Sequence, residues 1–149
     1  MDLSTFYGFL GVSSTQLADA NQANGMKDEA EKAWTHLSDY TIIFFVIMLL
    51  FSIGMAIYYY TKYNKQPGRH YTPLQWLYVG LTSLGIVFLL TFVIAFAMQK
   101  TGNIEGLLML EFKLALANTV WALGGYLIVS LIWCNVPQLP TNAYRFLKI

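Results

Sequence analysis

Charged residues are scarce in this sequence. Only 11% of the 149 residues are Asp, Glu, Lys or Arg, whereas soluble globular domains carry about a quarter. Hydrophobic residues make up 56% and aromatic residues 16%. These few charged residues cannot cover a water-soluble surface. The composition therefore excludes an ordinary soluble domain and favours an integral membrane protein. The formal net charge of +1 gives no reason to expect a nucleic-acid partner.

Side chains that commonly carry chemistry are also few. The single cysteine, Cys134, excludes an internal disulfide and a cysteine-only metal or iron–sulfur site within one chain. The two histidines, His36 and His70, are predicted to lie on opposite sides of the membrane, so they cannot form a bis-histidine haem site in one chain. The sequence has no Gly-rich phosphate loop, Ser–His–Asp set or paired intramembrane carboxylates. We therefore expect a protein that is not an enzyme, with no catalytic residues, no cofactor and no metal.

The N-terminal segment lacks basic residues before Lys27. A secretory signal peptide needs a basic region ahead of its apolar stretch, so we expect this segment to be retained. Its apolar run within residues 1–12 is far shorter than the ~20 residues that cross a bilayer, and it is interpreted as an interfacial or docking segment. Residues 13–15 are good helix N-caps and Asn24-Gly25 is a stop signal, which together predict a short polar helix.

Three long apolar stretches follow. The first, Tyr40–Tyr60, has no charge and is about 31 Å long as a helix. The second begins at Pro73 or Leu77 and ends near Met98, and the third is Leu107–Trp133. The sequence therefore predicts an all-α, polytopic membrane protein with three transmembrane helices and a short N-terminal extramembrane helical segment.

An amphipathic stretch precedes the first span. Apolar and small residues recur there at helical spacing, and no Gly or Pro interrupts residues 26–53. The recurring residues are Met26, Ala30, Trp34, Leu37 and Thr41. The pattern predicts one continuous helix from about Met26 to Tyr60.

Aromatic residues gather near the expected ends of the spans. Trp and Tyr favour the boundary between hydrocarbon and water, because their rings are apolar and their edges are polar. The predicted interfacial anchors are Trp34, Tyr58, Tyr59, Tyr60, Trp76 and Trp133.

The basic residues indicate an orientation. Residues 61–72 carry three Lys or Arg and the C-terminal tail carries two, whereas residues 1–39 carry six acids and two lysines. Cytoplasmic loops are enriched in Lys and Arg. We therefore expect residues 1–39 outside, a transmembrane domain at 40–136 and a cytoplasmic tail at 137–149, in a bacterial inner (plasma) membrane. The bias is modest, so the inverted topology stays open.

One face of the third span is small and polar. Its residues follow spacings of four, three, four and three: Glu111, Ala115, Asn118, Ala122 and Gly125. Small and polar residues hold membrane helices together, so helix packing within one chain or between identical chains is the first interpretation. An ion path lined by Glu111 and Asn118 is the second, because ionisable residues inside a membrane often mark function. Contact with a different subunit or a lipid is the third.

Weaker packing seams are present on the other two spans. The first span offers Phe45, Met48, Ser52 and Ala56, and the second offers Gly80, Ser83, Val87, Thr91 and Ala95.

The functional expectation follows from the lack of catalytic and metal-binding motifs and from the small, polar face of the third span. We expect a non-catalytic integral membrane subunit, surrounded by membrane lipid, that forms a homo-oligomer or packs with other membrane subunits. Its setting would be a larger cell-envelope complex of the secretion, motor or respiratory type. The alternative is a homo-oligomeric channel or pore-forming effector lined by the third helix.

The orientation gives a direct prediction. In a Cys134→Ser background, cysteines introduced at Ser14 and Thr101 should react with a membrane-impermeant thiol reagent in intact cells. Cysteines at Asn64 and Asn142 should react only after permeabilisation, because the basic segments are inside. Labelling of position 64 in intact cells would show the opposite orientation.

Overall fold

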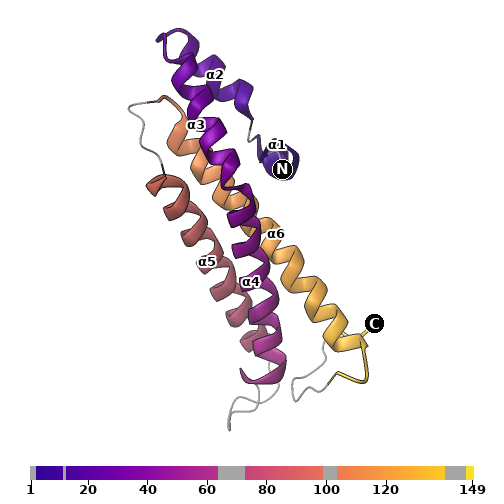
Figure 1. The fold of residues 1–149 in the computed structure, drawn as a ribbon. Coiled ribbons are helices and arrows are strands. Elements are labelled where there is room, and N and C mark those ends of the chain that lie inside the picture. The colour runs from indigo at the N-terminus through magenta and orange to yellow at the C-terminus, as the bar shows by residue number, and fades with distance from the viewer. Residues whose placement is uncertain (1–2, 12, 64–72, 99–103, 140–146) are drawn as a thin grey trace. The chain divides into compact units, whose positions relative to one another are not determined.

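A computed structural model describes residues 3–11, 13–63, 73–98, 104–139 and 147–149. Every regular element in these residues is helical (Figure 1), which confirms the all-α class. Their bounds are α1 Leu3–Tyr7, the 3-10 helix η1 Gly8–Leu10, α2 Ser14–Gln22, α3 Lys27–Asp39, α4 Thr41–Thr61, α5 Pro73–Ala97 and α6 Leu107–Asn135.

Helices α4, α5 and α6 are long and apolar enough to cross a membrane. Their bounds differ from the predicted spans by one or two residues at most ends, and α5 starts at Pro73. Several residues used in the predictions lie outside the described ones, namely Asn64, Lys65, Arg69, His70, Thr101, Asn142 and Arg145.

The chain divides into two compact units, and each is described by itself. Unit 1 comprises residues 1–47 and 88–118, and unit 2 comprises residues 48–87 and 119–149. Helices α4, α5 and α6 each contribute one stretch to each unit.

The N-terminal helices of unit 1 have local start and stop signals. Ser13 has an extended backbone, and its hydroxyl accepts a hydrogen bond from the backbone N–H of Gln16 at 3.3 Å, which caps the start of α2. After α2, Gly25 adopts a φ of 70°, a conformation that glycine enters without steric cost. The chain then turns into α3, and α2 and α3 pack on each other.

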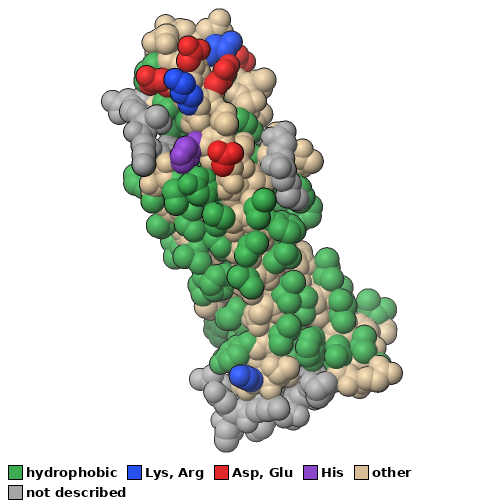
Figure 2. Space-filling view, in the orientation of Figure 1, with side chains coloured by type: hydrophobic (Ala, Val, Ile, Leu, Met, Phe, Trp, Pro, Cys, Tyr) green, Lys and Arg blue, Asp and Glu red, His purple; other side chains and the backbone are tan. Residues whose placement is uncertain are grey.

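The amphipathic character of α3 decides which of its sides is buried. Ala30, Ala33 and Leu37 belong to the hydrophobic core of unit 1, together with Leu107 and Leu110 of α6. Charged side chains of α3 are exposed, and Figure 2 shows acidic, basic and histidine side chains gathered over the N-terminal helices. The spanning helices present mainly hydrophobic side chains in the same view.

The prediction of one continuous helix from Met26 to Tyr60 is wrong at Tyr40. The Tyr40 N–H bonds to the carbonyls of Leu37 and Ser38 instead of the carbonyl four residues back, so α3 ends in a tightened turn. Ser, Asp and Tyr at 38–40 are only moderate helix formers, which explains a break without Gly or Pro. The Phe44 N–H bonds to the Tyr40 carbonyl at 3.1 Å, so helical bonding resumes at once.

Unit 2 has a core rich in tyrosine. Ala56, Tyr59, Tyr60, Val79, Tyr126 and Cys134 form its buried cluster. The Tyr60 ring stacks on Trp133 with ring centroids 6.0 Å apart, and its hydroxyl lies 3.5 Å from the Cys134 sulfur. Cys134 therefore occupies the place of a small buried residue.

Candidate functional site: a buried polar junction on α6

The side chain of Asn118 lies at the centre of a polar junction in unit 1. Its Nδ2 donates to the Phe44 carbonyl of α4 at 3.1 Å and to Thr91 Oγ1 of α5 at 2.8 Å. Its Oδ1 accepts a hydrogen bond from the hydroxyl of Tyr7 in α1 at 3.1 Å. We call these four residues the Asn118 junction.

The Asn118 junction uses both N–H donors of the amide and its oxygen. An amide that is buried without partners costs several kcal/mol in an apolar medium, on the order of 2–7 kcal/mol depending on the reference state. Asn118 and Tyr7 are at most 1% exposed, so water does not satisfy them. Burial raises the pKa of Tyr7 well above its ordinary value, so its phenol stays protonated and able to donate. The junction therefore links α1 and three spanning helices within unit 1.

The other predicted residues of the α6 face are also buried. Ala115 and Ala122 have no exposed surface, and Glu111 is 1% exposed. Among the described residues, Glu111 Oε2 has no hydrogen-bond partner. Lys113 lies off this face and is half-buried, as its spacing implies. Whether the face also serves an ion path or another subunit stays a prediction.

Gly125 continues the face into unit 2. A Cβ at Gly125 would lie 2.8 Å from Ser52 Oγ and 3.3 Å from Ser52 Cβ, so a side chain at this position would force Ser52 to shift and glycine favours the close approach of α4 and α6. Gly80 likewise favours the close approach of α5 and α6, because a Cβ there would lie 2.9 Å from the ring of Tyr126. The Ser83 hydroxyl donates to the Phe51 carbonyl at 3.0 Å and joins α5 to α4.

Sequence reasoning missed a second set of polar contacts in unit 2. The Tyr126 hydroxyl donates to the Trp76 carbonyl at 2.9 Å, and Trp76 Nε1 donates to Ser130 Oγ at 2.9 Å. A signal was present, since steps of four from Ala122 reach Tyr126, Ser130 and Cys134, all buried. The predicted face, which was defined by alternating steps of four and three, does not include these three residues.

The predicted aromatic anchors differ in exposure. Tyr59 and Tyr60 are fully buried in unit 2, whereas Tyr58 is 38% exposed. Trp34, Trp76 and Trp133 are half-buried. Trp76 has an interhelical hydrogen bond, so its position serves packing as well. A place at the membrane boundary stays a prediction for all six.

A second attachment of the N-terminal helices was also missed. Asn21 of α2 is fully buried, and its Nδ2 donates to the Leu17 carbonyl at 2.8 Å and to the Glu105 carbonyl at 3.0 Å. The Glu105 N–H donates back to Asn21 Oδ1 at 2.9 Å. This reciprocal pair, which we call the Asn21 clasp, holds α2 against the segment that precedes α6. An isolated Asn in a polar helix gives no sequence signal for such a contact.

Comparison with known proteins finds no matching family model, no matching curated protein and no matching solved structure. Function is therefore inferred from contacts. Among the described residues, no three His, Cys, Asp or Glu side chains come together as metal ligands would.

Neighbouring glycines of α6 provide a matched test of close packing. Gly125→Leu should lower the free energy of unfolding in mixed micelles by about 1–3 kcal/mol, because the larger side chain overlaps Ser52. Gly124→Leu is the control, since a Cβ at Gly124 meets no atom within 4 Å and should change stability little. Equal effects of the two substitutions would contradict the close approach at Gly125.

Proposed function

We propose that the chain is a non-catalytic integral membrane subunit whose N-terminal helices provide a fixed docking platform in a larger cell-envelope complex. The observation that carries this proposal is the double attachment of those helices within unit 1. Tyr7 of α1 is bonded in the Asn118 junction, and Asn21 of α2 is bonded in the Asn21 clasp. A segment held at two buried polar sites presents a constant surface, which lowers the entropic cost of binding a partner.

The exposed side of α3 supplies the partner-facing surface. A shallow hollow there is lined by polar and charged side chains: Asp28, Glu31, Lys32, Thr35, His36 and Asp39. The lining includes three acidic side chains and one lysine, so the surface favours a partner with a basic patch. Polar surfaces of this kind suit recognition outside the membrane, where water screens imperfectly matched charges.

The spanning helices leave most of their apolar surface outside the chain's own core. In the most apolar 18-residue stretch of each helix, 28% of the residues of α4 and 33% of the residues of α5 and of α6 are buried. Identical copies or other membrane subunits would pack on the remaining surface, and lipid would cover the rest. The α6 face is occupied by the chain's own helices in each unit, so association between copies would use other surfaces.

The finer localisation belongs to the same proposal. We propose a bacterial inner (plasma) membrane location, and the basic residues favour an orientation with the N-terminus and α3 outside and the C-terminus in the cytoplasm. In that orientation the acidic surface of α3 would meet extracytoplasmic partners.

The channel alternative gains no support from the described contacts. A pore-lining Asn118 would need amide groups available to water or ions, whereas both its N–H groups and its oxygen are bonded within the chain. Ala115 and Ala122 have no exposed surface to line a path.

A charge reversal on α3 tests the platform. After gentle extraction, native mass spectrometry should show species larger than the single 16.9 kDa chain. Glu31→Lys should reduce the assembled fraction several-fold, because it removes an acid from the charged hollow and adds a like charge for a basic partner. Asp19→Lys, at an exposed position of α2, is the matched control and should leave assembly unchanged. Only single chains with lipid, under every extraction condition, would contradict the proposal.

A further inference from the structure

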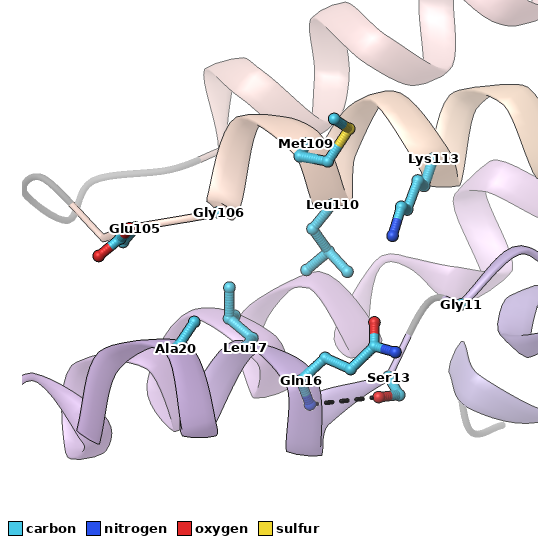
Figure 3. Close-up of a pocket in the computed structure, with 10 residues that line it drawn as sticks. All are labelled: Gly11, Ser13, Gln16, Leu17, Ala20, Glu105, Gly106, Met109, Leu110 and Lys113. Atoms are coloured by element: carbon cyan, nitrogen blue, oxygen red, sulfur yellow. Dashed lines mark hydrogen bonds between the residues drawn. The ribbon is translucent and has the colours of Figure 1, made fainter. Parts of the chain in front are cut away.

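A small pocket lies in unit 1 between α2 and the beginning of α6 (Figure 3), with a volume of about 170 Å³. Polar groups line it at both ends. Ser13, Gln16 and Lys113 lie near Gly11 at one end, and Glu105 lies at the other. Leu17 and Leu110 separate the two ends.

The ammonium of Lys113 and the amide of Gln16 converge on Gly11. A Cβ at Gly11 would lie 3.6 Å from Lys113 Nζ, 3.7 Å from Gln16 Oε1 and 3.9 Å from Gln16 Nε2. Gly11 has a φ of 74°, a conformation that other residues rarely adopt. The φ therefore favours glycine at this turn, and the Lys113 ammonium and the Gln16 amide lie at ordinary contact distance from it.

Lys113 is not neutralised by an acid in the described part of the chain. The one carboxylate that lines the pocket, Glu105, accepts a hydrogen bond from Asn24 Nδ2 at 3.3 Å and is directed away from Lys113 in Figure 3. The first turn of α2 lies at the same end of the pocket and adds partial positive charge. A half-buried ammonium beside such a helix end attracts an anion.

The depth of Lys113 follows from the register of α6 against α4 in unit 1. The hydrogen bond from Asn118 to the Phe44 carbonyl places these two residues at one level. Five residues before Asn118 is Lys113, and five residues before Phe44 is Asp39, the last residue of α3. The apolar helix α4 begins two residues later at Thr41. Lys113 therefore lies near the end of unit 1 at which α4 and α6 begin.

An almost wholly apolar groove adjoins the pocket. Met109 lines both, and the groove is completed by Phe92, Leu108 and Phe112, with a volume of about 400 Å³. The ring of Phe92 lies on α5 and extends the groove along the spanning helices. A cationic end joined to an apolar groove matches a molecule with a phosphate at one end and hydrocarbon at the other.

We propose that this pocket binds the phosphate of a phospholipid headgroup at Lys113, with an acyl chain along Phe92 and Phe112. The inference rests on the three helices spanning a membrane, and it does not depend on the proposed assembly. Lys113 donates charge-assisted hydrogen bonds to phosphate oxygens, and the Gln16 amide donates a further one.

Lipid retention by single chains tests this site separately from assembly. The protein in detergent micelles would be titrated with phosphatidylglycerol, and bound lipid would be counted by native mass spectrometry. Lys113→Met, which keeps the length of the side chain and removes its charge, should weaken binding about fivefold, as expected for one basic residue at a membrane surface. Lys113→Arg should stay within about twofold of the unaltered protein, because the phosphate can still be paired.

Lys32→Met, on the exposed surface of α3, is the control for a general loss of positive charge and should leave binding unchanged. Inorganic phosphate and glycerol 3-phosphate form the soluble arms, and the proposal expects both to bind far more weakly than the lipid. Equal lipid retention by Lys113→Met at unchanged melting temperature would overturn the proposal. Inorganic phosphate binding as tightly as the lipid would also overturn it, because the acyl groove would then contribute nothing.

Discussion

The amide of Asn118 is the constraint on which unit 1 depends. An asparagine buried in an apolar helix bundle is tolerated only if its donors and acceptor are satisfied, because no water is available to replace a missing partner. Its three partners come from α1, α4 and α5, so one side chain determines where four elements meet. The position of α1 follows, since Tyr7 reaches the junction only if Leu3 and Tyr7 enter the core. The clasp at Asn21 then holds α2 near the start of α6.

Unit 2 is held together by different means. Glycine at positions 80 and 125 allows close approach of helices, and the side chains of Trp76, Ser83 and Tyr126 donate interhelical hydrogen bonds. In lipid the hydrophobic effect does not distinguish helix from acyl chain, so close packing and hydrogen bonds provide the association energy. Each such bond is worth about 0.6–2 kcal/mol, which makes the number and fit of contacts more important than any single one.

Local patterns in the sequence predicted much of this arrangement. Long apolar runs predicted the three spanning helices, and residue spacing predicted the buried side of α6, because both depend only on neighbours along the chain. Tyr40 shows the limit, since a one-residue turn formed without any breaker residue. The partners of Asn118 and Asn21 could not be predicted, because Tyr7 and Glu105 are 111 and 84 residues away and nothing local marks them. The pocket at Lys113 likewise requires α2 and α6 to be placed side by side.

The most direct test is a double-mutant cycle between Tyr7 and Asn118. Free energies of unfolding in mixed micelles would be measured for Tyr7→Phe, Asn118→Ala and the double variant. The account predicts a coupling energy of about 1 kcal/mol, because the hydroxyl of Tyr7 has its partner in the Asn118 amide. The parallel cycle of Asn118→Ala with Tyr126→Phe should be additive, since the Tyr126 hydroxyl donates to Trp76. Additivity in the first cycle as well would contradict the claim that Asn118 holds the N-terminal segment to the spanning helices.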